Sequence, residues 1–301
     1  MPKKDIPVYN IDHLSLFKQT DILISRFAPY LAIHKNLHSA HKHSFYHLVM
    51  FTAGGGTHAI DFHTYVVKPF QIYFMIPGQV HSWSFEGHVD GYVVNFSDQF
   101  FQSFLLKPDY LDQFPFYSSI AEDSVVDLPV NIQAKVQHYF EELIAESESG
   151  LPFGLDMVKS LLLQLFYTVG RLGYVETPGK STSHNYKMLK NFRKLVDQHF
   201  GTLRLPKEYA ELLNVTPNHL NALSKDLVGM PAGDLIRNRI VLEAKRLLVN
   251  LELDIAEIAY KLNFEDNSYF SKFFKKQVGL TPGEFRKEEI RKVANDNNIL
   301  K

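Results

Sequence analysis

Residues 254–278 read DIAEIAYKLNFEDNSYFSKFFKKQV, the pattern of two short helices joined by a tight turn. In each half, apolar residues recur at spacings of three and four, which place side chains on one face of a helix. The first half contributes Ile255, Ile258, Ala259 and Leu262, and the second contributes Phe270, Phe273, Phe274 and Val278. A helix-turn-helix unit is therefore predicted, with the polar side of its second helix left for solvent or a ligand.

The same pattern occurs upstream, in residues 205–227. A helix is predicted over 207–213, then a break, then a second helix that Thr216 can cap, with Pro217 at its first position. The face of this second helix opposite its leucines carries Asn218, Asn221, Ala222 and Lys225. Such a face suits the major groove of DNA, because asparagine can hydrogen-bond adenine and lysine can contact guanine or phosphate. A long helix, predicted over 232–249, lies between the two units.

The charge distribution also favours a polyanionic partner for this half of the chain. The 301 residues contain 32 Lys and Arg against 33 Asp and Glu, a net charge of −1. Residues 181–301 hold 20 of the basic and 15 of the acidic residues, a net charge of +5, which leaves −6 upstream. We therefore expect the C-terminal half to bind double-stranded DNA.

Several spaced motifs of this half resemble the AraC/XylS family of transcription regulators. They are Arg239-Ile240, AKRLL at 244–248, IAEIA at 255–259, FEDNSYFSKFFKK at 264–276 and GLTPGEFR at 279–286. The resemblance implies two recognition helices in successive major-groove segments, held about one helical turn of DNA apart by the long middle helix. It also implies contact with RNA polymerase as a possible further partner.

Mapped by motif, the resemblance implies a set of DNA-binding residues. The base readers are Asn218, Asn221 and Ala222 in the first unit and Asn267, Ser268 and Lys272 in the second, and Lys225, Lys275 and Lys276 add further contacts. Three positions depart from the family pattern. Ala222 stands where arginine is frequent, Ser224 replaces an aromatic residue, and Asn263 replaces a turn glycine.

The N-terminal half has a different character. Residues 22–96 read as short segments rich in Val, Ile, Tyr and Phe between turn signals, which is typical of an all-β barrel or sandwich. Helices are predicted over 131–148 and 153–172, and residues 175–185 read as a linker. The predicted fold is therefore α+β: a β-barrel with following helices over residues 1–174, and an all-α double helix-turn-helix domain over residues 186–301.

Two stretches rich in histidine, HKHSFYH at 41–47 and PGQVHSW at 77–83, resemble the two histidine motifs of cupin barrels. The resemblance implies that the barrel is cupin-like. Residues two apart on a strand share a face, so His41 and His43 can point into a barrel, where His81 can join them. However, His47 stands where metal-binding cupins have a glutamate. We therefore predict no metal site and no cofactor, and a small-molecule effector pocket at His41, His43, His47, His81 and Trp83.

The helix predicted over 153–172 carries an apolar stripe: Leu155, Val158, Leu162, Leu165 and Val169. Such a stripe packs either on its own domain or against a second subunit. Because it exceeds what a helix on a small barrel needs to bury, we expect it to join a homodimer.

Together these features predict a DNA-binding transcription regulator and not an enzyme. Neither secretion nor membrane spanning is expected, because the chain has no cysteine, no signal-peptide pattern and no apolar stretch of membrane-spanning length. A cytoplasmic location without membrane contact is expected. Two alternatives stay open: a metal-dependent cupin enzyme, and a regulator whose barrel only dimerises.

Overall fold

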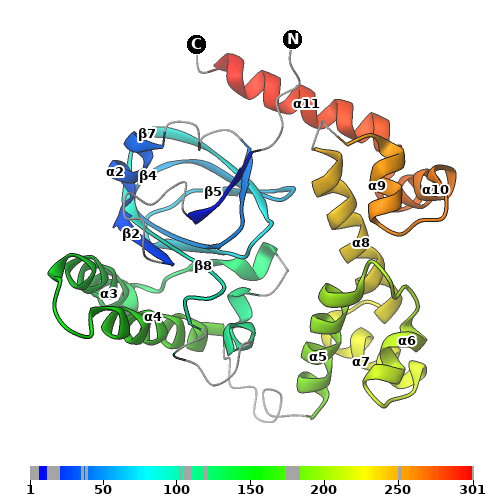
Figure 1. Ribbon diagram of the computed structural model, residues 1–301, viewed down its shortest axis with the longest axis horizontal. Helices are drawn as coiled ribbons and strands as arrows, with labels where there is room; N and C mark the ends of the chain where they lie inside the picture. Colours follow the sequence, from blue (N-terminus) through cyan, green and yellow to red (C-terminus); the bar gives the residue numbers. More distant parts are fainter. Residues whose placement is uncertain are drawn as a thin grey trace. The chain divides into compact units, whose positions relative to one another are not determined.

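The computed structural model describes residues 7–11, 21–34, 37, 40–101, 104, 110–117, 121–173, 184–249 and 253–299. They fall into two compact units, one within Pro7–Tyr174 and the other within Val175–Lys301. The first unit contains a sheet and helices and the second contains helices, which confirms the predicted α+β architecture (Figure 1). Most of the predicted linker lies outside the described residues, and its last two residues, His184 and Asn185, already belong to a helix.

The first unit is built on a curled sheet, in which eight strands pair among the described residues. In chain order they are β1 (Val8–Tyr9), β2 (Ile22–Arg26), β3 (His41–His43), β4 (Tyr46–Ile60), β5 (His63–Val66), β6 (Gln71–Met75), β7 (Val80–Phe96) and β8 (Val125–Asp127). The sheet order is β1-β3-β7-β4-β6-β8, with β2 also on β7 and β5 also on β4. The long strands β4 and β7 are antiparallel, and register shifts between residues 51 and 55 of β4 bend the sheet.

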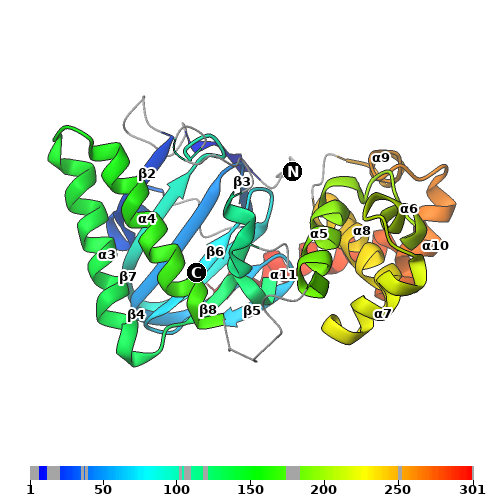
Figure 2. The same cartoon turned by 90° about the horizontal axis from the view of Figure 1, so that it is seen from below.

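The two faces of this sheet have different coverings. Helices α3 (Val130–Ser149) and α4 (Gly154–Gly170) lie across one face (Figure 2). Because successive strand residues point to opposite faces, Leu48 and Met50 of β4 pack in the cluster under these helices, whereas Val49 and Phe51 pack in a second cluster. That second cluster includes Phe27 of the short helix α2 (Phe27–Ile33) and Trp83, and it occupies the inner face.

The apolar stripe of α4 packs into the core of its own unit. Val158, Leu162, Leu165 and Val169 are each at most 2% exposed and share one cluster with the strands, whereas Leu155 is 51% exposed. The assignment of this stripe to a subunit interface is therefore wrong for the four buried residues. The sheet and the aromatic residues of the 3-10 segments Tyr110–Gln113 and Pro115–Tyr117 already cover them.

The second unit contains the five predicted helices in the predicted order, with one further helix before them and one after them. They are α5 (His184–His199), α6 (Pro206–Leu212), α7 (Pro217–Val228), α8 (Ala232–Leu248), α9 (Ile255–Lys261), α10 (Asn267–Val278) and α11 (Pro282–Ile299). Helix α8 contacts both α7 and α10, and it buries Ile236, Ile240, Ala244 and Leu248. Within the described part of the chain, no helix is both long and apolar enough to cross a membrane.

Candidate nucleic-acid interface and inner histidine cluster

The two helix-turn-helix units have the same backbone turn. Asn214 and Asn263 have φ angles of 54° and 56°, in the left-handed region that asparagine tolerates better than most side chains. In each unit the next amide closes the turn: Val215 N–H donates to Ala210 O at 2.9 Å, and Phe264 N–H donates to Ala259 O, also at 2.9 Å. Asn263 therefore preserves the turn in place of glycine.

Side-chain caps fix the start of each second helix. The Thr216 hydroxyl oxygen accepts from His219 N–H at 3.2 Å, and the Asp266 carboxylate accepts from Tyr269 N–H at 2.7 Å. Both helices end at a glycine in the left-handed region, Gly229 with φ 81° and Gly279 with φ 87°. Helices α7 and α10 thus have the same length of 12 residues and the same kinds of cap at both ends.

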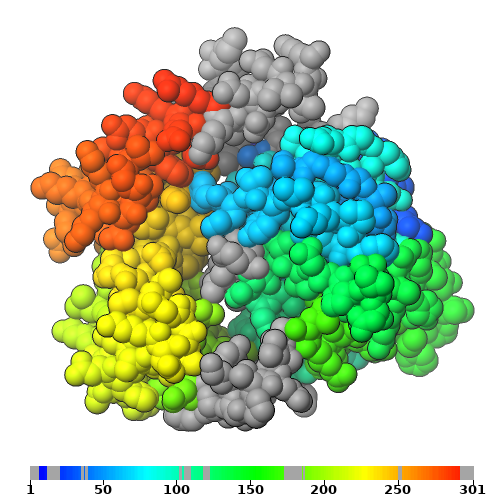
Figure 3. All heavy atoms as spheres, turned by 180° about the vertical axis from the view of Figure 1, so that it is seen from behind, coloured from blue at the N-terminus to red at the C-terminus, as the bar shows by residue number. Residues whose placement is uncertain are grey.

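Each of these two helices presents a polar face to solvent. Eight of the nine predicted DNA-binding residues are exposed: Asn218, Ala222 and Lys225 on α7, and Asn267, Ser268, Lys272, Lys275 and Lys276 on α10. Figure 3 shows α7, in yellow, and α10, in orange, at the surface of the helical unit. His219 and Tyr269 are also exposed at the same place on each helix, and sequence reasoning missed them. Their spacing of three residues before Ala222 and Lys272 was the available signal.

Asn221 does not belong to this surface. Its Oδ1 accepts a hydrogen bond from the N–H of Ala232 at 3.1 Å, at the first position of α8. Its prediction as a base reader is therefore corrected, because the amide is already used to join α7 to α8. Ser224, which replaces the expected aromatic residue, has a similar role: it is buried and donates to Met230 O at 2.6 Å.

The two polar faces differ in charge. On α10, Lys272, Lys275 and Lys276 are all exposed, whereas on α7 the exposed Lys225 is followed by the exposed Asp226. Phosphate attraction is consequently concentrated on α10.

Within the helical domain, an arginine connects the two helix-turn-helix units. Arg204 precedes α6, and its guanidinium donates to Leu262 O and, at 2.9 Å, to Asn263 O. The same guanidinium lies 4.0 Å from the centre of the Phe264 ring. These contacts hold the turn of the second helix-turn-helix unit against the segment that begins the first helix-turn-helix unit.

The N-terminal unit gathers five buried histidines on the inner face of its sheet. His41 pairs in register with His81 across β3 and β7, and His43, His47 and His58 join them, each at most 3% exposed. The ring centres of His41 and His81 are 4.0 Å apart, and the ring centre of His43 is 4.8 Å from that of His41 and 4.7 Å from that of His81. The Trp83 ring lies 4.9 Å from His81, so the predicted pocket residues are brought together. His58 was missed, because it stands alone in the sequence and only strand pairing brings it here.

Four of these imidazoles, those of His43, His47, His58 and His81, are neutral near pH 7. Burial lowers the pKa of His43, His58 and His81 well below the ordinary value of 6.5, and repulsion among neighbouring imidazoles lowers it further. Burial also lowers the pKa of His47, to about 3. Neutral imidazole is the form that accepts hydrogen bonds and binds metal ions.

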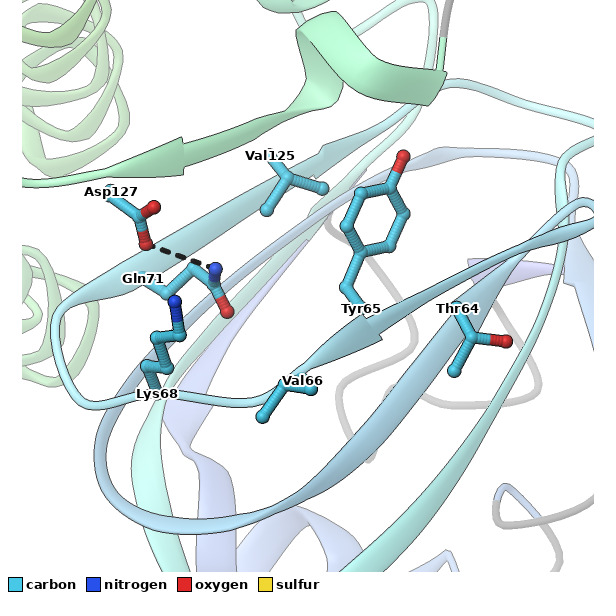
Figure 4. A pocket seen from close by; sticks show the side chains of 7 residues that line it. All are labelled: Thr64, Tyr65, Val66, Lys68, Gln71, Val125 and Asp127. Atoms are coloured by element: carbon cyan, nitrogen blue, oxygen red, sulfur yellow. Dashed lines mark hydrogen bonds between the residues drawn. The ribbon is translucent and has the colours of Figure 1, made fainter.

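A separate pocket opens on the rim of the sheet (Figure 4). It has a volume of about 480 Å³ and is lined by Thr64, Tyr65, Val66, Lys68, Gln71, Val125 and Asp127. The Gln71 amide donates to Asp127 at 3.0 Å inside it. None of the five histidines lines this pocket.

Both halves of the chain match known families. Residues 28–166 match the AraC-like ligand binding domain, and residues 209–288 match a helix-turn-helix domain. The chain is 24% identical over 270 residues to the HTH-type transcriptional activator RhaR of Enterobacter sp. (strain 638), covering 86% of this chain and 90% of that protein.

Solved structures of similar proteins include the C-terminal domain of AraT, a response regulator from Geobacillus stearothermophilus. It is 30% identical, with a TM-score of 0.33, and the match covers 35% of this chain and 88% of that one. ToxT from Vibrio cholerae is 15% identical, with a TM-score of 0.43, and the match covers 89% of this chain and 98% of ToxT. With a ligand-binding domain of the AraC type followed by its helix-turn-helix domain, the chain belongs to the AraC family of transcription regulators.

Proposed function

We propose that α7 and α10 are the two base-reading helices of this regulator. The observation that carries the proposal is the pair of capped, equivalent helices whose polar faces are exposed while their apolar faces are buried. Helix α8 has 17 residues and is therefore about 25 Å long, enough to hold two such helices on nearby turns of one DNA face.

Each exposed residue receives a role from its chemistry. Base edges are assigned to Asn218, His219 and Ala222 on α7 and to Asn267, Ser268, Tyr269 and Lys272 on α10, and phosphates are assigned to Lys225, Lys275 and Lys276. Amides, hydroxyls and a lysine can hydrogen-bond base edges, and Ala222 can contact a thymine methyl group.

Salt dependence of DNA binding by the full chain tests the phosphate contacts. Three lysine–phosphate contacts predict a slope of about −2.7 per bound chain for the logarithm of affinity against the logarithm of salt concentration, and Lys275→Ala should reduce that slope by about 0.9 per bound chain. Lys135→Ala on α3, an exposed lysine of the other unit, is the matched control and should leave the slope unchanged. A parent protein whose affinity is independent of salt would contradict the proposal.

We further propose that the inner histidine cluster, with Trp83, is the effector site of the ligand-binding domain. The burial of five imidazoles beside one tryptophan supports a specific recognition role over simple packing. The cupin-enzyme alternative has no other support, since both halves of the chain match regulator domains. A domain that only dimerises would bind no effector at this cluster.

The remaining partners are proposed on narrower grounds. The relatives are named transcriptional activators, which supports activation through contact with RNA polymerase. A regulator acts where the chromosome is, and we propose a cytoplasmic location on that ground. In vitro transcription from a bound promoter tests activation through contact with RNA polymerase. Variants that keep DNA binding but lose activation would identify the residues that contact the polymerase.

We also propose that the chain is a homodimer, with the contact moved from the buried stripe to the start of α4. Large apolar side chains cluster there with exposed fractions of 48–80%: Leu151, Phe153, Leu155 and Met157. Phe153→Asn removes apolar area, and asparagine tolerates the φ of 66° at this position. Light scattering should show a dimeric parent and a monomeric variant, whereas Val130→Asn, at the far end of α3, should stay dimeric. A monomeric parent would exclude the dimer.

A further inference from the structure

We propose that His41, His43 and His81 bind one late first-row divalent transition-metal ion, such as Zn²⁺, on the inner face of the sheet. Each histidine offers one ring nitrogen, and these three atoms lie within 4.8 Å of one another. The residues come from the paired strands β3 and β7, so the sheet itself fixes their spacing. The inference deepens the proposed effector site and depends on that proposal only for its regulatory consequence.

Two ring nitrogens of this cluster are buried and have no hydrogen-bond partner. Among the described residues, Nε2 of His43 and Nε2 of His81 have no hydrogen-bond partner, although both side chains are at least 97% buried. Buried polar atoms in folded proteins are nearly always satisfied. Two unsatisfied imidazole nitrogens beside a third histidine therefore indicate a ligand that accepts electron pairs.

Neighbouring side chains contact two imidazoles of the cluster in a way that is compatible with metal binding. His81 Nδ1 lies 3.2 Å from His58 Nε2, and if His81 donates there, its Nε2 keeps a lone pair for the ion. His47 Nδ1–H donates to the Asn95 amide oxygen at 2.6 Å, so His47 Nε2 also carries a lone pair. This is the arrangement in which outer residues orient metal-binding imidazoles.

The size of the site favours an ion over an organic molecule. The centres of the three ligand rings are 4.0–4.8 Å apart, which leaves no space for a further ring between them. Zinc–nitrogen bonds of about 2.0–2.1 Å in a tetrahedron place ligand nitrogens about 3.3 Å apart, so small side-chain movements would close the site. Three imidazole ligands suit zinc, nickel, copper or iron, and a water molecule at the fourth position could donate to His47 Nε2.

Metal binding by the full chain, purified without a histidine tag and stripped with a chelator, tests the inference. Equilibrium dialysis against Zn²⁺ should give one tightly held equivalent, and Co²⁺ should give the visible absorption of a tetrahedral site. His43→Gln and His81→Gln should each lose that equivalent, and His88→Gln, an exposed histidine of the same strand β7, should retain it. His58→Leu should weaken binding by about 10–100-fold with the Co²⁺ spectrum displaced, and His58→Gln, which can still accept from His81, should restore much of the affinity.

Trp83 fluorescence reports whether each variant is folded, because Trp83 is the only tryptophan in the chain. If both ligand variants unfold, the stoichiometry and the Co²⁺ spectrum of the parent protein decide the matter. A parent that holds no equivalent of Zn²⁺, or folded ligand variants that still hold one, would overturn the inference. DNA affinity is measured on the same samples without metal, so failure of metal binding and failure of DNA binding are separate results.

Discussion

Asn221 gives the sharpest contrast between a residue that builds the DNA-binding unit and one that reads DNA. Its Oδ1 accepts from Ala232 N–H, and Ala232 is fully buried, so Asn221→Ala leaves an amide without a partner. An unsatisfied buried donor costs about 1–3 kcal/mol. For a domain of this size that loss lowers the thermal midpoint by roughly 5–15 °C.

Asn218→Ala is the matched variant on the same helix. Asn218 is exposed, so its removal should change stability by less than about 0.5 kcal/mol while weakening discrimination at one base by about 1–3 kcal/mol. Asn221→Asp keeps an acceptor oxygen near the start of α8 and should recover most of the lost stability.

Urea denaturation of the full chain separates these outcomes. Circular dichroism follows the helices, and Trp83 fluorescence follows the N-terminal unit, which should be unchanged in all three variants. If Asn221→Ala is as stable as the parent but selects a different DNA sequence, the assignment of Asn221 to a structural role is refuted.

Three further changes test the packing and the proposed metal site. Leu162→Ala should destabilise the N-terminal unit by about 2–5 kcal/mol, seen as an earlier transition in Trp83 fluorescence, because Leu162 is fully buried between α4 and the sheet; an unchanged transition would place Leu162 outside the core. Arg204→Ala should lower the stability of the helical unit by about 1–3 kcal/mol in circular dichroism, and Arg204→Lys should not rescue it, because lysine lacks the planar guanidinium that lies over the Phe264 ring while Nη2 donates to both carbonyls; full rescue by lysine would exclude a role for that ring contact. Zn²⁺ at one hundred times its dissociation constant should stabilise the N-terminal unit by about 2.7 kcal/mol, and chelator should reverse this; equal stability with and without Zn²⁺ would count against a native site.

The helix-turn-helix units could be predicted from the sequence because their signals are local. Thr216 and Asp266 cap helices within three residues of themselves, and the apolar spacing of each helix fixes its buried face. The role of Asn221 could not be predicted in this way, because its partner Ala232 is on the next helix and the hydrogen bond exists only in the folded unit.

The spacing of apolar residues in the sequence shows that a face is buried, but it does not show which element packs against that face. The stripe of α4 indicated a covered face, but periodicity does not distinguish a sheet of the same chain from a second subunit, and the sheet covers Leu162 and Leu165. Similarly, strand alternation predicted that His41 and His43 share one face of the sheet. The position of His58 beside them depends on the pairing of β4 with β7 after a register shift.

Selection of binding sites from a random duplex library by the full chain tests the central claim most directly. The parent should select a motif in two parts about one helical turn apart. Lys272→Ala should relax one or two positions of one part, and Asn218→Ala should relax positions of the other part only. Selection of the parent motif by both variants, or loss of preference at every position from either change, would contradict the assignment of α7 and α10 as the base-reading helices.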